Sequence, residues 1–250
     1  MTTEITLHAY IINLEKSTDR MAHMRQEIEA LGVPYTRIEA VYGPDLPEPI
    51  QEFDEKRFNL LTGKHKNSRE IGCYLSHINA FKAFLASSAS HALILEDDVH
   101  LPRELTTLLD RAIEHQAHWD LLRLSSSRQG QFIKITQLDA THQLAYNLKV
   151  LKNTGAYLIT RKGAEACLNK MLPMCLPYDV ALDRDWDIGI KTACIDPMPV
   201  ELEDFPTQII HKAKRIRRYR ATTFHIFHLI TRIQRKAYRR KLAQRAGIQL

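Results

Sequence analysis

Three adjacent acids, Glu96, Asp97 and Asp98, are the residues of this chain whose spacing points most directly to chemistry. They follow the short apolar run of residues 92–95, which predicts a buried strand of a mostly parallel sheet. Ligands of open α/β sheets bind in the crevice beyond the carboxyl ends of the strands. Adjacent carboxylates are costly to bury unpaired, and a hard divalent cation prefers oxygen ligands. The pattern therefore predicts a metal site, with a charged loop after a core strand as the alternative.

A second acidic group contains Asp179 and Asp183. Asp179 follows Pro177 closely, at a position typical of a helix N-cap, so capping alone would explain it. Asp183 comes four residues later, which allows both carboxylates to share one face of a helix. Because the two acidic groups belong to different elements, each can line one wall of a cleft. A carboxylate in that second wall is a candidate general base.

The elements that would position these acids begin with a β-α-β unit. Residues 7–14 predict a strand, and a helix follows that begins near Ser17 and ends before Gly32. A second strand is expected over residues 35–41. Arg20 lies in the first turn of the helix, beside the end of the first strand. A solvated arginine is the alternative to a functional one at this position.

A long helix is predicted over residues 68–85, because apolar residues recur there at steps of three and four. Ser76 and His77 lie off this apolar stripe, and a structural histidine is the alternative to a functional one. The remaining predicted elements alternate between strands and helices, which indicates an α/β protein. They are a short helical piece at 53–61, strands at 119–124, 153–160 and 193–200, helices at 105–117 and 161–171, and weaker strands at 132–138 and 146–151.

The composition is that of a globular protein. The chain has 250 residues, of which 44% are hydrophobic and 26% are charged, enough for one large domain or two small ones. No transmembrane helix is expected, because no run of about eighteen apolar residues exists. The first residues lack the pattern of a signal peptide. The 4 cysteines form no C-x-x-C pair, so reduced thiols in a cytosolic protein are expected.

The net charge of +6 is distributed unevenly. Residues 212–250, the basic tail, contain 13 Lys or Arg and no acid, which leaves 35 − 13 = 22 basic and 29 acidic residues in the first 211. The tail predicts a basic amphipathic helix, suited to an anionic membrane surface. The alternatives are packing of this helix on its own acidic body or in an oligomer contact, and a solvated disordered tail. Its apolar side is expected to contain Ile226, Ile230, Ile233 and Ala237, and its basic side Arg232, Arg235, Lys236 and Arg239.

Five short blocks occur in order along the chain: Tyr10-Ile-Ile-Asn-Leu-Glu-Lys-Ser-Thr-Asp-Arg20, Gly72-Cys-Tyr-Leu-Ser-His77, Leu95-Glu-Asp-Asp-Val99, Thr154-Gly-Ala-Tyr157 and Pro177-Tyr-Asp179. Together they resemble glycosyltransferase family 25, the lipopolysaccharide-biosynthesis glycosyltransferases. The resemblance implies a GT-A type fold, a Rossmann-like α/β domain that holds a nucleotide sugar. We expect this domain to span residues 1–211 and the basic helical tail to span residues 212–250.

The resemblance also implies an activity. It implies inverting, metal-dependent transfer of galactose or glucose from a UDP-sugar to a hydroxyl of a lipopolysaccharide or lipooligosaccharide glycan, with a β-galactosyltransferase as the expected member. The expected metal is Mn²⁺ or Mg²⁺. The expected partners are the UDP-sugar, a lipid-linked oligosaccharide and, through residues 212–250, a membrane surface, with no nucleic acid. The expected location is cytoplasmic, peripheral on the inner face of the bacterial inner membrane.

The resemblance assigns roles residue by residue. Asp179 is the leading candidate for the catalytic base, and Asp183 is the second. GT-A enzymes often take a further metal ligand from near the end of the body, and His211 is the candidate. The metal would be held by Glu96, Asp97 and Asp98, with the first and third as direct ligands. The donor site would contain Asn13, Arg20, Ser76, His77, Thr154 and Gly155.

Three other functions fit parts of the sequence. A nucleotidyltransferase acting on sugar phosphates also uses acids at strand ends and a metal, but the Gly-rich phosphate loop it would usually carry is not visible. A nucleic-acid-binding protein would use the basic tail, yet the acidic body lacks a basic stripe with aromatic residues. A glycosidase would use two carboxylates and release free sugar.

Overall fold

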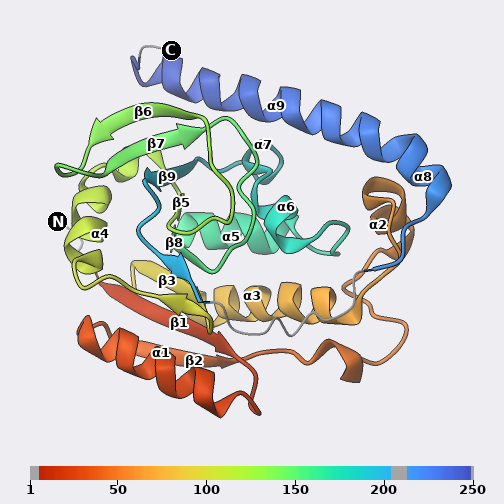
Figure 1. Cartoon of the computed structure of the whole chain (residues 1–250), viewed down its shortest axis with the longest axis horizontal. Coiled ribbons are helices and arrows are strands. Elements are labelled where there is room, and N and C mark those ends of the chain that lie inside the picture. The colour runs from red at the N-terminus through yellow and green to blue at the C-terminus, as the bar shows by residue number, and fades with distance from the viewer. Residues whose placement is uncertain (1–5, 204–212, 249–250) are drawn as a thin grey trace.

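The computed structural model describes residues 6–203 and 213–248. Its centre is an eight-stranded sheet in the order β2-β1-β3-β8-β5-β9-β7-β6, covered by helices on both faces (Figure 1). The sheet strands are β1 (Leu7–Asn13), β2 (Tyr35–Glu39), β3 (His91–Glu96), β5 (Leu121–Arg123), β6 (Phe132–Gln137), β7 (Gln143–Asn147), β8 (Ala156–Thr160) and β9 (Thr192–Asp196). A separate two-stranded sheet pairs β4 (Val99–His100) with β10 (Glu201–Leu202).

The α-helices alternate with the strands through most of the chain. They are α1 (Thr18–Ala30), α2 (Glu55–Thr62), α3 (Ser68–Ala86), α4 (Leu105–Glu114), α5 (Arg161–Lys170), α6 (Tyr178–Leu182), α7 (Asp185–Ile188), α8 (Arg217–Ala221) and α9 (Thr223–Arg245). The predicted α/β class is therefore confirmed. Among these described helices, none is long and apolar enough to cross a lipid bilayer.

The sheet is mostly parallel, as predicted. The pairs β1–β2, β1–β3 and β5–β9 are parallel, whereas β8 is antiparallel to both of its neighbours and β7 to both of its own. Six strands therefore run in one direction, and β7 and β8 run in the other. Because β8 is antiparallel, its amino end lies at the same edge as the carboxyl ends of β1 and β3.

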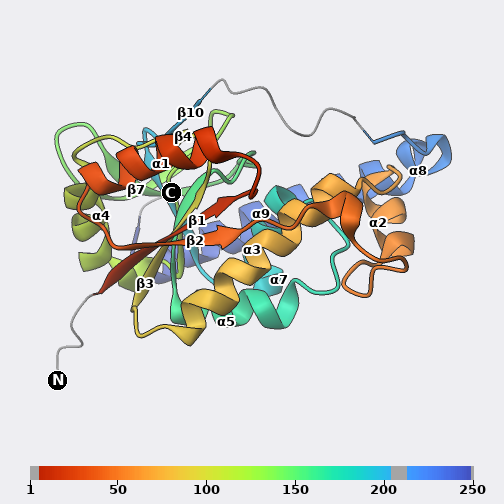
Figure 2. The same cartoon turned by 90° about the horizontal axis from the view of Figure 1, so that it is seen from below.

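The strands alternate between two apolar clusters, one on each face of the sheet. Ala9 and Ile11 of β1 pack toward α1 and α4, whereas Tyr10 and Ile12 pack toward α3 and α5. Successive strand side chains point to opposite faces, so a strand covered on both faces is apolar throughout. Figure 2 shows α1 and α3 on opposite faces of the β1–β2 part of the sheet.

Several element bounds differ from the predicted ones. The strand expected over 193–200 ends at Asp196, because Pro197 has no N–H to donate to a sheet. The weak strand expected over 146–151 is β7, which begins earlier and ends at Asn147. The predicted end of α1 is confirmed, since Gly32 follows the helix with a φ of +65°.

Helix α9 runs along the outside of the molecule, from α2 at one end toward β6 and β7 at the other (Figure 1). Part of its basic side is directed inward. Arg235 and Arg239 are buried, whereas Ile226, Ile230 and Ile233 are about half exposed, at 59%, 47% and 58%. The periodicity of α9 was read correctly from the sequence, but part of its basic side, not its apolar side, packs against the body.

Candidate functional site

The site lies where the chain changes direction across the sheet. After β1 the chain adds β2 on one side and then β3 on the other, so the carboxyl ends of β1 and β3 flank a switch point. Asn13 is the last residue of β1, and Glu96 is the last residue of β3. Thr154 precedes the amino end of the antiparallel β8. These three elements therefore bring their polar ends to one crevice.

Asp97 is held by two residues of the first β-α unit. Asn13 Nδ2 donates to Asp97 Oδ2 at 2.7 Å, and Arg20 Nη1 donates to Asp97 Oδ1 at 2.8 Å. Arg20 therefore forms an ion pair in the crevice instead of extending into solvent. Since both oxygens of Asp97 are engaged, its role in this arrangement is to fix Asn13 and Arg20 beside the acidic residues.

Asp98 has a different environment. Its Oδ1 is buried without a hydrogen-bond partner, and its Oδ2 lies 3.8 Å from Arg20 Nη1. Burial, together with the charges of Glu96 and Asp97, raises the pKa of Asp98 to about 7. A partly buried carboxylate with a free oxygen and acidic neighbours is suited to a cation, which would satisfy the oxygen and offset the repulsion. The residues present therefore fit a hard divalent metal.

Glu96 is supported from two elements. His77 Nε2 on α3 lies 3.3 Å from Glu96 Oε1, and Thr154 Oγ1 donates to the same oxygen at 3.4 Å. Burial acts to raise the pKa of Glu96, but the hydrogen bond and charge of His77, with help from Thr154, outweigh it and lower the pKa. The carboxylate is thus kept ionised, as a metal ligand requires.

A softer set of ligand atoms overlaps this one. Cys73, His77 and Glu96 each offer one ligand atom, and the three atoms lie within 4.8 Å of one another. Thiolate and imidazole favour metals such as zinc, whereas carboxylates suit manganese and magnesium. Burial raises the pKa of the Cys73 thiol well above its ordinary value, and Glu96 and Asp179 raise it further. A thiol held protonated in this way is a poor ligand, so the carboxylates fit the expected metal better.

His77 is buried, and it links the acids to a pair of tyrosines. Its Nδ1 lies 3.0 Å from the Tyr157 hydroxyl, which lies 2.8 Å from the Tyr178 hydroxyl. The ring of Tyr178 stacks on the imidazole with centroids 3.9 Å apart. Neither tyrosine was predicted as a site residue, although each stands in one of the five blocks. For Tyr178, the sequence feature that could have indicated a role was its position immediately before Asp179.

Ser76 and Gly155 support the backbone of the site. Ser76 Oγ accepts from the Val41 N–H at 2.8 Å and donates to the Gly72 carbonyl at 2.7 Å, which joins α3 to the loop after β2. The Gly155 carbonyl accepts from the Glu96 N–H at 2.8 Å. A Cβ at Gly155 would lie 2.8 Å from a Leu202 methyl carbon, so a side chain would not fit without movement.

One cavity of about 570 Å³ opens over these residues. It is bordered by the acids, by α3 and by the loop after β2. The predicted residues that line it are Arg20, Ser76, His77, Glu96, Asp97 and Asp98. Residues not predicted for this site also line it, among them Lys16, Tyr42, Arg69, Cys73 and Asn153. Its size and mixture of polar and apolar walls are typical of a small-molecule site.

A second cavity, of about 600 Å³, contains Asp179. Asp179 lies in the first turn of α6, whose N-cap is Pro177, so the predicted capping role is not the one observed. The two cavities are neighbours, because Arg69 and Asn153 line the first while the adjacent residues Glu70 and Lys152 line the second. The acidic motif and Asp179 thus line two adjoining cavities, whereas the sequence led us to expect two walls of one cleft.

Asp183 does not join Asp179 in this cavity. Its side chain is 2% exposed, and its two oxygens lie 2.7 Å from Arg235 and 3.0 Å from Arg239. Asp185 pairs with Arg239 at 2.9 Å. Two acids of the body and two arginines of α9 therefore form a buried ionic cluster that joins α9 to the body. His211, the candidate additional metal ligand, lies outside the described residues.

Arg123 is a further residue that the sequence did not single out. It ends β5, is 1% exposed, and donates to the carbonyls of Asn153 and Ser125. Its charge helps to lower the pKa of Glu96. A single arginine at a strand end carries no distinctive sequence signal, because the same pattern is usually a solvated side chain.

These features define an α/β protein with a crevice and a group of carboxylates at a topological switch point. A family model, "Glycosyltransferase family 25 (LPS biosynthesis protein)", matches residues 6–182, and the chain belongs to this family. The resemblance found in the five sequence blocks is therefore confirmed. The GT-A type expectation follows from this membership, and the observed sheet with helices on both faces agrees with it.

Two relatives and one solved structure illustrate the range of similar proteins. Procollagen galactosyltransferase 1-A of Xenopus laevis is 29% identical over 66% of this chain and 29% of its own length. A putative glycosyltransferase of Haemophilus influenzae is 29% identical over 70% of this chain and 61% of its own length. The chain thus spans less than two thirds of either relative. S. aureus TarS 1-349 in complex with UDP-GlcNAc covers 95% of this chain and 70% of its own, with a TM-score of 0.41 at 10% identity.

Proposed function

We propose that this chain is an inverting, metal-dependent glycosyltransferase that moves galactose or glucose from a UDP-sugar to a hydroxyl of a lipopolysaccharide or lipooligosaccharide glycan. The observation that carries the proposal is the pair of adjoining cavities. One is lined by Glu96, Asp97 and Asp98, which could bind a cation, and the other by Asp179. Family membership supports the class of reaction, and the name of the Xenopus relative supports galactose as the donor sugar.

The first cavity would hold the donor. Glu96 and Asp98 would bind Mn²⁺ or Mg²⁺, because Asp97 is engaged by Asn13 and Arg20 and Asp98 has a free buried oxygen. A metal there would supply positive charge for the departing diphosphate. Arg20 lies in the same wall and adds a fixed positive charge of its own.

The second cavity would hold the acceptor. A hydroxyl oxygen of the acceptor attacks the anomeric carbon of the donor. The bond from that carbon to the diphosphate breaks, and the electron pair of that bond leaves with UDP. Asp179 would take the hydroxyl proton, since it lines the cavity that adjoins the one with the donor carboxylates. Attack from the face opposite the leaving group inverts the anomeric centre. Tyr178 positions the neighbouring Asp179 by stacking on His77.

The exposed face of α9 would meet the membrane that carries the acceptor. Four large apolar side chains project from it, namely Ile226, Leu229, Ile230 and Ile233. Arg232 and Arg240 on the same helix are exposed, so positive charge accompanies the apolar stripe. Such a surface binds anionic lipid by partial burial of its apolar side chains and by charge attraction. We propose peripheral association through α9, on the inner face of the bacterial inner membrane.

A screen of UDP-sugars for metal-dependent release of UDP tests the proposed reaction. Incubation with UDP-galactose or UDP-glucose, an oligosaccharide acceptor and Mn²⁺ is expected to release UDP, and a chelator is expected to stop the release. Release of diphosphate would indicate a nucleotidyltransferase instead. Release of free sugar from an oligosaccharide without any nucleotide would indicate a glycosidase.

A further inference from the structure

The cavity around Asp179 is strongly cationic. It is formed by α2, α3, the loops at residues 128 and 152, and the start of the α8–α9 segment. Its acids are Glu70 and Asp179. Its basic residues outnumber them and are Lys64, Arg128, Lys152, Arg215 and Arg220, with His228 beside them. A wall that must accept a neutral hydroxyl does not need this excess of positive charge.

Most of these cations have no acidic partner. Lys64 lies 4.0 Å from Glu70, which accounts for one cation and one acid of the cavity. The other four, the cation quartet, are Arg128, Lys152, Arg215 and Arg220. In the part of the chain that the structure describes, none of the quartet forms an ion pair. Asp179 is then the single acid of the cavity that faces four positive charges.

The pKa of the neighbouring His228 is affected by the same positive charges. Burial lowers the pKa of His228, and the charges of Arg220 and Lys152 lower it further. Positive charges disfavour a further proton at this position, so two members of the quartet, Arg220 and Lys152, act on the space beside His228. The cavity is therefore arranged to attract an anion.

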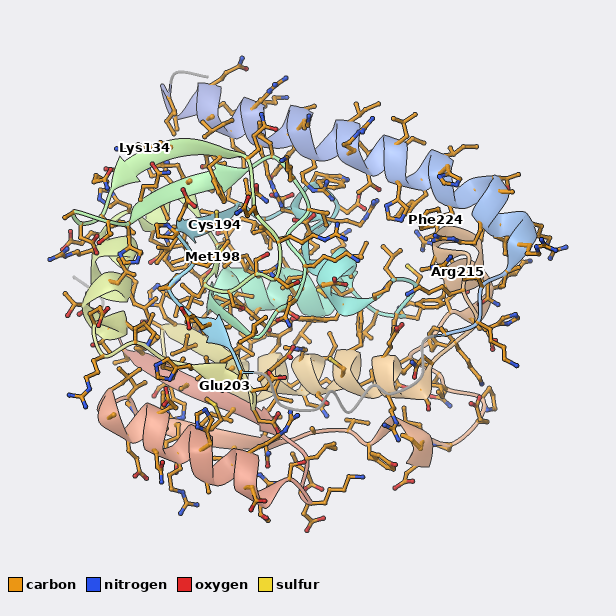
Figure 3. The ribbon with its side chains drawn as sticks, in the orientation of Figure 1. Lys134, Cys194, Met198, Glu203, Arg215 and Phe224 are labelled. Carbon is orange, nitrogen blue, oxygen red and sulfur yellow. The ribbon has the colours of Figure 1, made fainter. Side chains whose placement is uncertain are left out.

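An aromatic wall stands beside the quartet. Phe224 and Phe227 line the cavity, and the Arg220 guanidinium lies 3.6 Å from the centroid of the Phe224 ring. Figure 3 shows Arg215 and Phe224 on the same side of the molecule, near the start of α9. A phenyl ring can pack against the apolar C–H face of a sugar, while the arginines hold a charged substituent. The combination favours a saccharide with an anionic group.

We propose that the acceptor saccharide carries a phosphate ester, which the cation quartet binds while a hydroxyl of the same acceptor is directed to Asp179. This inference rests on the proposed function. The phosphate is an anchor, and none of its bonds changes during transfer. A phosphate ester fits better than a carboxylate because it carries up to two charges and three terminal oxygens, which several arginines can bind at once.

Direct binding tests the inference without knowledge of the full acceptor. The protein is first saturated with UDP and Mg²⁺, so that the donor cavity is filled, and is then titrated calorimetrically with glucose 6-phosphate, glucose or glucuronate. Glucose 6-phosphate is expected to bind at least about tenfold more tightly than either of the others. Equal binding of glucose and glucose 6-phosphate would overturn the inference, and equal binding of glucuronate would overturn the choice of phosphate.

Variants locate the binding. Arg128→Gln and Arg215→Gln change exposed side chains, so neither is expected to disturb folding. Each is expected to weaken glucose 6-phosphate binding about tenfold and to leave UDP binding unchanged. Lys134→Gln is the matched control, because Lys134 lies on β6 at the opposite end of the molecule (Figure 3). Equal effects of all three variants would overturn the assignment to the quartet.

The two proposals fail in different ways. If UDP and Mg²⁺ do not bind at all, the donor site and the proposed function are wrong. If both bind and UDP is released from a UDP-sugar, but glucose 6-phosphate binds no more tightly than glucose, only the inference of a phosphorylated acceptor is wrong.

Discussion

At the scale of the residue, two adjacent aspartates of one motif have different tasks. Asp97 receives hydrogen bonds from Asn13 and Arg20, whereas Asp98 Oδ1 is buried without a partner. Residue type therefore does not distinguish the supporting carboxylate from the proposed metal ligand. The neighbours that the fold supplies make the difference, and they lead to separate predictions for the acids of the site.

Replacement of Asp98 is expected to remove metal-dependent donor binding. In Asp98→Ala, affinity for UDP in the presence of Mn²⁺ should fall at least about tenfold and transfer should be lost, because one of two direct ligands is missing. Affinity for UDP without metal should be unchanged. Calorimetric titrations with and without Mn²⁺ measure both values. An unchanged response to Mn²⁺ would exclude Asp98 as a ligand.

Replacement of Asp179 is expected to separate binding from turnover. Asp179→Asn keeps the shape of the side chain but cannot take a proton, so turnover should fall by a factor of about 10² to 10⁴. UDP and metal affinity should match those of the unmodified protein, since Asp179 lines the other cavity. Transfer rates and UDP titrations measure the two effects. Near-normal turnover would remove Asp179 from the role of base.

At the scale of the element, α9 buries two of its arginines, Arg235 and Arg239, and exposes its isoleucines. Arg235 and Arg239 reach Asp183 and Asp185, and this buried cluster decides which face of the helix packs. An apolar stripe is normally expected to face the core, so the exposed stripe is an unusual feature of this helix. It supports the proposed membrane surface, and the buried cluster has a pH dependence of its own.

The exposed stripe is expected to control binding to lipid. The pair Ile226→Gln and Ile233→Gln removes its two most exposed isoleucines, so binding to anionic vesicles should fall at least about tenfold. The free energy of unfolding should change by less than about 0.5 kcal/mol per substitution, because both side chains are exposed. Vesicle sedimentation measures binding, with zwitterionic vesicles as the control. Equal sedimentation of the variant and the unmodified protein would exclude the stripe.

The contribution of Asp185 in the buried cluster to the free energy of unfolding is expected to depend on pH. Burial raises the pKa of Asp185 from 3.8 to about 6, although Arg239 opposes the shift. The folded chain therefore holds this proton more tightly than the unfolded chain, and the stabilisation is complete below about pH 4 and is lost as the pH rises through 6. Relative to the unmodified protein, Asp185→Asn should gain about 2 kcal/mol between pH 4 and pH 7.

Urea unfolding of both proteins at the two pH values measures this difference. The comparison between variant and unmodified protein cancels the other groups that titrate in the same range. A difference in the free energy of unfolding that does not change with pH would show that Asp185 has the same pKa in the folded and unfolded chains.

At the scale of the whole molecule, α9 packs against the rest of the fold through its buried ionic cluster. Removal of α9 would leave Asp183 and Asp185 buried without their partners, and burial of an unpaired charge is costly. The helix also contributes Phe224 and Phe227 to the second cavity. A truncated chain is therefore unsuitable for a test of membrane binding, because it would lose stability and a cavity wall together.

Single substitutions test this coupling. Arg239→Met removes a 1% exposed side chain that pairs with both acids, so the free energy of unfolding should fall by about 3 to 5 kcal/mol. Arg240→Met is the matched control, because Arg240 is exposed, and its effect should stay within about 0.5 kcal/mol. Thermal and urea unfolding measure both. A similar small effect of the two variants would show that α9 is only loosely joined to the body.

The sequence by itself determined the α/β class, most elements, the acidic motif and the family. Apolar runs and helical spacing report local burial, and the three acids of the motif are contiguous in the chain. The placement of Asp97, with Asn13 and Arg20 around it, was not readable, because its partners are 84 and 77 residues away. Asp183 looked equivalent to Asp179 for the same reason.

Only the tertiary structure decided which aspartate faces a cavity, which face of α9 packs, and which cations meet around Asp179. Periodicity defines the faces of a helix but not what lies against them. From the sequence, the apolar face of α9 would be expected to pack against the body. The side that packs instead carries two arginines that pair with buried aspartates. Such pairing depends on distances between residues that are remote in sequence, and local patterns carry no information about those distances.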